Sequence, residues 1–363
     1  MPRRPGTLGG VRAPCSCLGL LGLVAGCNSV LGLDPVELVD DRARTLVFDN
    51  SASRVDLVDF PVLVALDPAK IPYDEIVDPA TRLRFFDPDT GQDLPFEIER
   101  WDPTGRSDVW VKVPTIDARS TTDHILMFFG AAAGGIEQPS GVWSSFEFVY
   151  HGMPNKLASS IGAHPGTAEG VATAEGTIAS APRFSGGDWS AIEFENTGGL
   201  LSGWDRFTLE LWLYPDYAPG LPLPTEPQYL TTEGALRGGR VRTSDAGIDT
   251  LLTPQIDVQF EEATSYLHPA IQRQAWVYTV YTFDGQVLWI YRNGGLADVE
   301  AFNQPTRLIQ APGQLMLGAR SDAMAGLIDE VRVSRSDRDA DWVNAQFLSM
   351  TGKFVTYAEA GGR

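Results

Sequence analysis

Oxygen-bearing side chains that alternate along the chain are the first residues that could bind a metal ion. Asp87, Asp89 and Asp93 surround Gly91 in the run D-P-D-T-G-Q-D, and ligands at alternate positions are typical of calcium loops. The glycine comes one position too early for an EF-hand, and Ile98 stands where the bidentate glutamate would be. We therefore interpret the run as a hairpin turn.

Two carboxylates and four histidines are the main candidates for catalysis. Glu193 and Glu195 lie two residues apart, so in a strand they share a face, but no third acid follows in their run. A solvated strand face is the simpler interpretation of this pair. The four histidines do not form an H-x-x-x-H pair, and the sequence has no serine in a nucleophile elbow. The histidines are His124, His151, His164 and His268. We expect no catalytic residue and no enzyme activity.

Five aromatic side chains could instead bind sugar rings, because a flat amphipathic ring gives a large contact at low entropic cost. They are Trp189, Trp204, Trp212, Tyr214 and Tyr217. Aromatic side chains on sheet faces usually pack against other elements, so we expect most of the five to be packed in the core or between sheets.

The N-terminal segment has the features of an export signal. It contains Arg3, Arg4 and Arg12 but no acid, and its apolar run from Leu18 to Ala25 is far shorter than the ~20 residues of a membrane span. The motif L-V-A-G-C, which ends at Cys27, resembles the bacterial lipobox. That resemblance implies that residues 1–26 are a lipoprotein signal peptide and that Cys27 becomes the lipidated N-terminus. The alternative is an ordinary secretory peptide with an incidental cysteine.

Lipidation at Cys27 would set both the chemistry and the location of the mature chain. The other two cysteines, Cys15 and Cys17, would leave with the signal peptide, which excludes disulfides, thiolate catalysis and cysteine-ligated zinc. Acyl chains would hold the protein at a membrane through a tether over residues 27–43. Asn28 after the cysteine resembles an outer-membrane sorting signal, so we predict a lipid-anchored protein of the cell envelope, in the outer membrane of a Gram-negative bacterium.

Charge and length narrow the remaining function classes. The formal net charge is -19 and the sequence pI is about 4.5, which argues against nucleic-acid binding, since phosphate contacts need a basic face. A chain of 363 residues is long enough for two domains with their own cores. The sequence does not indicate an oligomeric state.

Short strands separated by turn residues fill residues 44–135. Leu94 to Arg100 alternates apolar and acidic residues, which predicts one buried face and one solvated face that carries Glu97 and Glu99. Pro, Asp and Gly clusters separate such runs, so we predict an antiparallel β-sandwich. The motifs L-R-F-x-D, L-P-x-E-I-E-x-W and V-W-V-K-V-P, which begin at Leu83, Leu94 and Val109, resemble a domain of unknown function in bacterial surface proteins. That resemblance implies no established activity.

A hairpin lies at the centre of the second region, residues 136–363. Ala275 to Gly295 contains two runs rich in Val, Tyr and Trp, joined at Asp284-Gly285 and followed by the turn Asn293-Gly294. This hairpin and the strand Phe207 to Pro215 resemble the laminin-G-like, or concanavalin A-like, jelly roll. The fold class we predict is therefore all-β, with two antiparallel β-sandwiches, the second a concanavalin A-like jelly roll.

Other parts of the second region are assigned from their patterns. Ala158 to Ala181 is rich in Gly and Ala and is expected to form a long surface loop. We expect Asp339 to Ser349 to be a short helix and Phe354 to Tyr357 to close the jelly roll. The resemblance also implies that a calcium ion could bind at the rim of the sandwich, where the candidate acids are Asp245, Asp249, Asp322 and Asp329. Weak calcium binding is our only cofactor hypothesis.

The jelly-roll resemblance implies a binding protein. Laminin-G-like folds recognise glycans or other proteins through rim loops and a concave face, so we expect carbohydrate or surface-ligand binding by the second domain. A structural or adhesion module that binds an envelope protein is the alternative. Laminarinase-like glycoside hydrolases share the fold, but their E-x-D-x-x-E run is missing. If the chain were a hydrolase, Glu193 and Glu195 would be the residues to test.

Overall fold

The structure is a computed structural model of the chain. It describes residues 42–131, 133–152, 156–218, 223, 227–232, 236–243, 251–258, 266–267 and 271–359. Residues 42–359 lie in one compact unit whose regular secondary structure is nearly all β-strand, so the predicted all-β class is confirmed. Cys27 and the tether over residues 27–43 lie outside the described residues, except for the last two positions of the tether. In the described part of the chain, no helix has the length and apolar character needed to cross a membrane.

The first sandwich packs two antiparallel sheets face to face. One sheet has the order β24-β1-β7-β3-β4 and the other the order β2-β6-β5. The strands of the first sheet are β1 (Ala43–Phe48), β3 (Leu83–Asp87), β4 (Gln92–Leu94), β7 (His124–Phe129) and β24 (Val355–Glu359); those of the second are β2 (Leu57–Leu66), β5 (Phe96–Arg100) and β6 (Ser107–Ile116). The short helical turns η1 (Tyr73–Glu75) and α2 (Pro79–Arg82) lie between β2 and β3, and α3 (Pro139–Val142) follows β7 and leads to the second sandwich. The apolar faces of both sheets form one core with buried Phe60, Phe85 and Val111.

The run Leu94 to Arg100, which we expected to be one strand, is divided at Pro95 between the two sheets. β4 pairs with β3 before the proline, and β5 pairs with β6 after it. A proline has no N–H for a ladder hydrogen bond, so it favours the point where the chain leaves one sheet for the other. Two short strands thus replace one long one.

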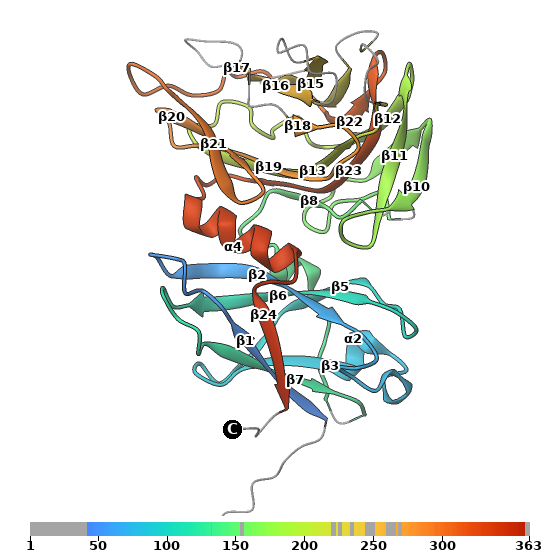
Figure 1. Cartoon of the computed structure of the whole chain (residues 1–363), viewed down its shortest axis with the longest axis vertical. Coiled ribbons are helices and arrows are strands. Elements are labelled where there is room, and N and C mark those ends of the chain that lie inside the picture. The colour runs from blue at the N-terminus through green and yellow to red at the C-terminus, as the bar shows by residue number, and fades with distance from the viewer. Residues whose placement is uncertain are drawn as a thin grey trace, which may run out of the picture. The chain divides into compact units, whose positions relative to one another are not determined.

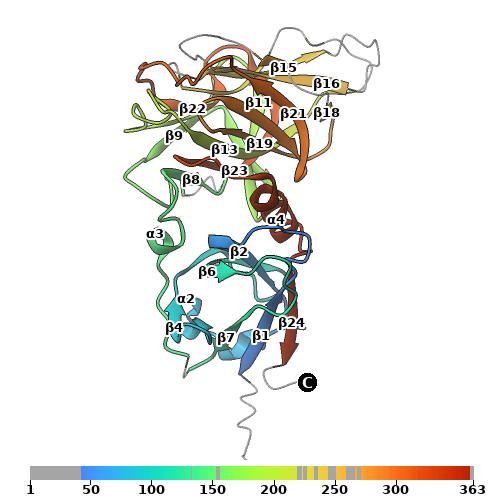
Figure 2. The same cartoon turned by 90° about the vertical axis from the view of Figure 1, so that its left-hand side faces the viewer.

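The last strand belongs to the first sandwich, which corrects the expectation that Phe354 to Tyr357 closes the jelly roll. β24 pairs antiparallel with β1, with Leu46 opposite Tyr357, and the two strands lie side by side in Figures 1 and 2. Phe354 is 1% exposed and stacks near Phe48 at a ring separation of 5.9 Å. The chain therefore returns to its first sheet after it has completed the second sandwich. The domain boundary at residue 135 itself stays a prediction.

The second sandwich is built from strands that hydrogen-bond into one continuous sheet, which folds into two layers. Its main path runs β17-β16-β15-β14-β23-β13-β19-β20-β21, and β8 to β12, β18 and β22 pair beside it. The strand bounds are β8 (Phe148–Tyr150), β9 (Gly166–Glu169), β10 (Val171–Glu175), β11 (Ser180–Gly187), β12 (Ser190–Phe194), β13 (Phe207–Pro215), β14 (Gln228–Thr231), β15 (Leu236–Thr243), β16 (Leu251–Val258), β17 (Tyr266–Leu267), β18 (Ile271–Gln272), β19 (Val277–Phe283), β20 (Val287–Arg292), β21 (Gly295–Ala301), β22 (Leu315–Ala319) and β23 (Ala323–Ser334). Its core includes Phe194, Leu211 and Ile290.

The central hairpin is confirmed. β19 and β20 pair antiparallel with Tyr281 opposite Ile290, and Asn293 and Gly294 both have positive φ in the turn that leads to β21, as a tight hairpin turn requires. The expected surface loop from Ala158 to Ala181 is wrong, because it contains β9, β10 and the start of β11. The small residues of this segment have a low β-propensity, which led to the loop prediction, but pairing with neighbouring strands outweighs that propensity.

A helix covers the outer face of the second sandwich. The predicted helix is confirmed as α4 (Ala340–Met350). Asp339 caps its N-terminus, because its side chain accepts a hydrogen bond from the Trp342 N–H. It contacts β2 of the first sandwich and β21 of the second, and Figure 1 shows it between β2 and β13. Trp212 on β13 donates its indole N–H to the sulfur of Met350. Both faces of β13 are therefore buried, including the face that carries Thr208 and Glu210.

The acidic run after β3 is the hairpin turn that we predicted. The carboxylate of Asp87 accepts hydrogen bonds from the backbone N–H groups of Asp89 and Thr90, and the Gly91 N–H donates to the Asp87 carbonyl. Gly91 has a φ of 70°, which glycine adopts without steric cost. Asp93 bonds Arg84 at 2.7 Å. These contacts account for the run without a metal ion.

Candidate functional site

The outer face of β12 carries a shallow hollow, which we call the Trp189 hollow. Ile192 and Phe194 point into the core and are fully buried, so Ala191 and Glu193 alternate to the outside. β9 places Glu169 opposite Ala191, and β22 places a glycine there on the other side. Small residues across this row leave a hollow of about 260 Å³; it is lined by Thr167, Glu169, Trp189, Ala191, Glu193, Met316 and Arg320.

Trp189 stands at the edge of this hollow in the turn between β11 and β12. Its side chain is 55% exposed, and its backbone has a φ of 57°, a left-handed conformation that costs an ordinary residue about 1–2 kcal/mol. The Trp189 N–H holds the turn by donating to the Arg320 carbonyl at 3.0 Å. The Trp189 carbonyl also packs against Gly170, where a Cβ atom would lie only 2.2 Å from the carbonyl oxygen, so only glycine fits there. A bulky residue kept in a strained position and exposed is a feature that clusters at binding sites.

Polar groups lie next to the ring. The guanidinium of Arg320 pairs with the Glu193 carboxylate at 2.5 Å, with side-chain exposures of 46% and 39%. The guanidinium supplies donors, the carboxylate supplies acceptors, and Glu169 adds a second exposed carboxylate. An aromatic platform beside paired donors and acceptors suits a ligand with an apolar ring face and several hydroxyl groups.

The other four aromatic candidates have different surroundings. Trp204 and Trp212 are buried, at 6% and 4% exposed, which confirms packing for these two. Tyr214 and Tyr217 are half-buried, and the Tyr217 hydroxyl accepts a hydrogen bond from the Ala325 N–H at 2.9 Å. Of the five, Trp189 alone is exposed.

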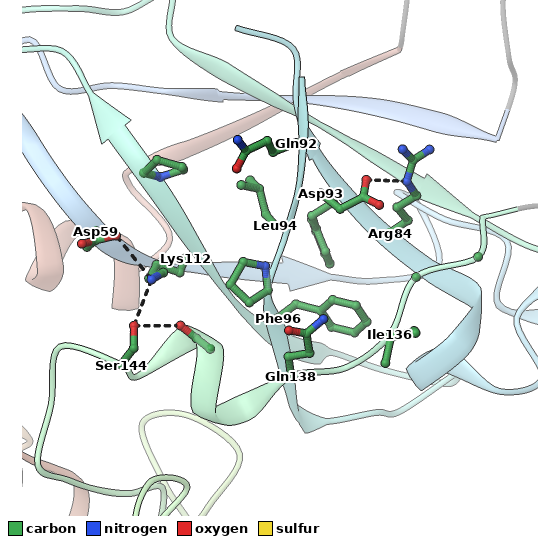
Figure 3. Close-up of a pocket in the computed structure, with 16 residues that line it drawn as sticks. Asp59, Arg84, Gln92, Asp93, Leu94, Phe96, Lys112, Ile136, Gln138 and Ser144 are labelled. Carbon is green, nitrogen blue, oxygen red and sulfur yellow. Dashed lines mark hydrogen bonds and ion pairs between the residues drawn. The ribbon is translucent and has the colours of Figure 1, made fainter. Parts of the chain in front are cut away.

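A larger pocket lies on the first sandwich, along the open edge beside β4 and β5 (Figure 3). Its volume is about 500 Å³. Lys112 bonds Asp59 at 3.3 Å and Ser144 at 2.9 Å, and the Arg84–Asp93 pair lies at the other side. The charges are thus paired within the pocket. Its aromatic rings, Phe85 and Phe96, are 0% and 1% exposed, so the pocket offers no ring on which a sugar could stack.

The rim acids proposed for calcium do not assemble among the described residues. Asp329 is fully buried rather than at the rim, and its carboxylate accepts hydrogen bonds from the backbone N–H groups of Thr177, Ile178 and Glu330. Asp322 is exposed in the turn before β23. Asp245 and Asp249 lie outside the described residues.

A buried ionic group, which we call the junction cluster, joins the two sandwiches. It consists of Glu97 and Glu99 from β5, His151 after β8, and Glu330 and Arg332 from β23, and none of them is more than 5% exposed. Nδ1 of His151 lies 2.8 Å from Glu330 and Nε2 lies 3.2 Å from Glu97. The solvated face that we expected for Glu97 and Glu99 is therefore wrong, because the second sandwich and the segment after α3 cover it.

The buried, charged environment of the junction cluster shifts the pKa values of its members in different directions. Burial alone would lower the pKa of His151, but Glu330, Glu97 and Glu99 raise it well above the usual value. Burial would raise the pKa of Glu97, yet His151 and Lys156 hold it far below the usual range. Burial, together with the nearby charge of Glu330, raises the pKa of Glu99 well above the usual value.

Arg332 is the central cation of this group. It is fully buried, pairs with Glu330, and stands over the rings of Trp110 and Trp143 at 4.3 and 4.9 Å from their centroids. Its Nη1 also lies 4.0 Å from the buried carboxylate of Glu210. The cation thus compensates carboxylates from two strands of the second sandwich while it packs on Trp110 of β6 in the first sandwich and on Trp143 after α3.

Sequence reasoning did not find the junction cluster, because no spacing relates the pair on β5 and the pair on β23 to each other or to His151. Glu99 and Glu330 lie far from His151 along the chain, and only the fold brings them together. The one available signal was His151 itself, which directly follows the wholly apolar strand Phe148 to Tyr150. His124 and His164 lie elsewhere and bond backbone carbonyls, and His268 lies outside the described residues.

Two protein-family models match parts of the chain. Residues 80–151 match the family described as "Domain of unknown function (DUF2341)", and residues 185–344 match the "Concanavalin A-like lectin/glucanases superfamily". The order of the two matches is the order that the sequence motifs predicted. None of the curated proteins compared matches the chain.

Several solved structures resemble the chain over part of its length. Domain 4 of AbnA, an extracellular arabinanase from Geobacillus stearothermophilus solved with arabinotriose, has 19% identity and a TM-score of 0.41 and covers 55% of this chain and 97% of its own. The binding domain of Paraclostridial Mosquitocidal Protein 1 has 15% identity and a TM-score of 0.45; the match covers 58% of this chain and 53% of the toxin domain. The ligand-binding domain of botulinum neurotoxin serotype D, solved with N-acetylneuraminic acid, has 10% identity and a TM-score of 0.43; the match covers 56% of this chain and 50% of the neurotoxin domain. The chain spans about half the length of the two toxin domains.

Proposed function

We propose that this chain, in which a domain of unknown function precedes a concanavalin A-like domain, is a lipid-anchored protein of the cell envelope that binds carbohydrate without cleaving it. The observation that carries the binding proposal is Trp189, whose exposed ring stands beside the Glu193–Arg320 pair on the second sandwich. The ring provides the contact for the apolar face of a sugar, and the ion pair provides partners for its hydroxyl groups.

The shape of the site favours one or a few sugar rings rather than a long buried ligand. The hollow is shallow, with about 260 Å³ of space, and its polar groups are exposed, so water competes for their hydrogen bonds. Binding to a single such site is therefore expected to be weak, and many copies on one cell surface would strengthen it through avidity. The acidic charge of the chain, -19 overall, favours neutral over acidic polysaccharides.

Two alternatives remain distinct from this proposal. A structural or adhesion module would bind a protein of the envelope and leave polysaccharides unbound. A glycoside hydrolase would need two carboxylates at a set separation, but Glu193 is paired with Arg320 and Glu195 lies just beyond the end of β12. Release of reducing ends from a polysaccharide, lost on Glu193→Gln or Glu195→Gln, would favour the hydrolase.

Replacing Trp189 with alanine is expected to weaken polysaccharide binding by about tenfold or more, which corresponds to about 1.4 kcal/mol, because the stacking surface is lost. Affinity electrophoresis measures this as the loss of retardation in gels that contain a retarding polysaccharide. The matched control is Leu296→Ala, which removes an exposed apolar side chain from β21 and should leave the retardation unchanged. If wild type and Trp189→Ala were retarded equally, the polysaccharide would not bind at Trp189.

The anchor is tested separately, because it rests on the motif that ends at Cys27. Wild-type protein made in a bacterial host is expected to enter the detergent phase on phase partitioning, and Cys27→Ser should remain in the aqueous phase. Each buried methylene of the acyl chains contributes about 0.8 kcal/mol to membrane binding. Cys17→Ser is the control, since that residue belongs to the predicted signal peptide. Equal partitioning of wild type and Cys27→Ser would contradict lipidation at this cysteine.

A further inference from the structure

We propose that Glu99, His151 and Glu330 of the junction cluster bind one divalent transition-metal ion, with Zn²⁺ or Mn²⁺ as the fitting class. This site is separate from the Trp189 hollow and does not depend on the carbohydrate proposal. The three residues come from β5, from the segment after β8 and from β23. An ion among them would therefore join the two sandwiches.

The separations of the candidate ligand atoms suit a metal ion. One oxygen or nitrogen from each residue lies within 4.8 Å of the others. Nδ1 of His151 is 2.8 Å from Glu330 Oε1 and 3.5 Å from Glu99 Oε2. Ligands about 2.1 Å from a common ion are separated by about 3.0–3.4 Å at right or tetrahedral angles. The two separations measured from His151 bracket that range. The third, between the Glu99 and Glu330 oxygens, lies within 4.8 Å, so these two carboxylates would draw together around the ion.

Glu99 is the observation that points to a missing cation. Glu97 bonds Lys156 and Glu330 bonds Arg332. Glu99 is 5% exposed, its Oε2 accepts a hydrogen bond from the Trp110 indole, and its Oε1 has no hydrogen-bond partner among the described residues. The ion-pair contact of Glu99 among the described residues is with His151, whose Nδ1 lies 3.5 Å from Oε2, so Oε1 remains a buried oxygen without a partner, which is costly. A metal ion bound between Glu99 and His151 would remove that cost.

Glu97 orients the histidine for this role. Its Oε2 lies 3.2 Å from Nε2 of His151, and it also accepts from the Trp143 indole and from Ser160. Metal binding would displace the proton from Nδ1; with Nε2–H donating to Glu97, the freed lone pair of Nδ1 then faces Glu330 and Glu99. Metal-bound histidines commonly donate their second N–H to a carboxylate in this way. Two carboxylates with one imidazole suit zinc or manganese better than calcium, which prefers oxygen ligands alone.

The burial of the site determines how it must be tested. Its three residues are at most 5% exposed, so an ion would enter as the chain folds rather than afterwards. Purified full-length protein is therefore unfolded in denaturant with a chelator, refolded with Zn²⁺ or with Mn²⁺, and dialysed against metal-free buffer. The bound metal is then counted by plasma mass spectrometry. The expected result is one equivalent per chain with at least one of the two ions.

Variants distinguish this site from adventitious binding. Glu99→Gln keeps the size of the side chain and removes one charged ligand, and it is expected to reduce the retained metal by at least tenfold. His124→Gln is the control, because it removes an imidazole outside the junction cluster and should retain the metal of the wild type. If wild type retains neither ion, or if Glu99→Gln retains as much as wild type, the proposal is wrong. His151 would then be held as an imidazolium between carboxylates.

Discussion

Replacing Arg332 with methionine is expected to lower the free energy of unfolding by about 3–5 kcal/mol, the usual cost of removing one partner from a buried ion pair. The guanidinium is fully buried against Glu330 and lies 4.0 Å from Glu210. Methionine matches much of the apolar volume, so the loss reports mainly the buried carboxylates that lose their guanidinium partner and the lost contact with two indole rings. Urea unfolding monitored by tryptophan fluorescence measures the change.

The control for this variant is Arg335→Met, three residues further along the chain. Arg335 is exposed and stands over the ring of Trp204 at 5.4 Å, so its loss should cost less than about 1 kcal/mol, as exposed cation–π contacts do. Equal destabilisation by the two variants would show that Arg332 is not a central ion of the junction. Two separate unfolding transitions in Arg332→Met would show that the junction couples the sandwiches in wild type.

Replacing Phe354 with alanine is expected to cost about 3–5 kcal/mol, as for other large aromatic residues in a core. Phe354 is 1% exposed and packs at 5.9 Å from Phe48 and 5.6 Å from Phe60, and its carbonyl accepts a hydrogen bond from the Asp49 N–H. It thus holds the final strand to the first sandwich. Unfolding by urea gives the free-energy change.

Hydrogen exchange locates the effect of Phe354→Ala. The Asp49 N–H donates to the Phe354 carbonyl, whereas the Phe48 N–H donates to Asp123 on the other side of β1. Because β24 pairs with β1, the amides of Val47 and Asp49, which face β24, should lose protection, whereas those of β19 in the second sandwich should keep it. Lys353→Ala is the control, since Lys353 is exposed and should change neither stability nor exchange. Faster exchange confined to the second sandwich would contradict the placement of β24.

Local patterns predicted the strands well because strand formation depends on alternation and turn chemistry. The hairpin at β19 and β20 is an example, since Asp284-Gly285 and Asn293-Gly294 supply the positive φ that such turns require. The turn at Asp87 is another, because its side-chain oxygen caps the backbone that follows. Both features are encoded within a few residues.

Long-range pairing and burial could not be predicted in the same way. The alternation of Leu94 to Arg100 predicted two faces, but it did not reveal that the acidic face meets a second sandwich and buries Glu97 and Glu99. Likewise, the β-rich run after Phe354 predicted a strand without its partner, β1. Contacts between residues hundreds of positions apart leave no periodic signal in the chain.

The candidate site was partly predictable. Trp189 and Glu193 were both singled out by residue type, but as members of separate groups. Arg320 was not, because it joins Glu193 only through the pairing of β12 with β22. The exposure of Trp189 and the burial of Trp204 and Trp212 depend on which layer covers each face, and that is a property of the complete sandwich.

The most direct measurement of the central claim is a glycan array probed in parallel with soluble wild-type protein that begins at Asn28 and with its Trp189→Ala variant. The expected result is binding of wild type to at least one class of neutral glycan and the loss of that signal in the variant. A flat response of wild type across the array, or equal signals from the two proteins, would contradict carbohydrate binding at the Trp189 hollow.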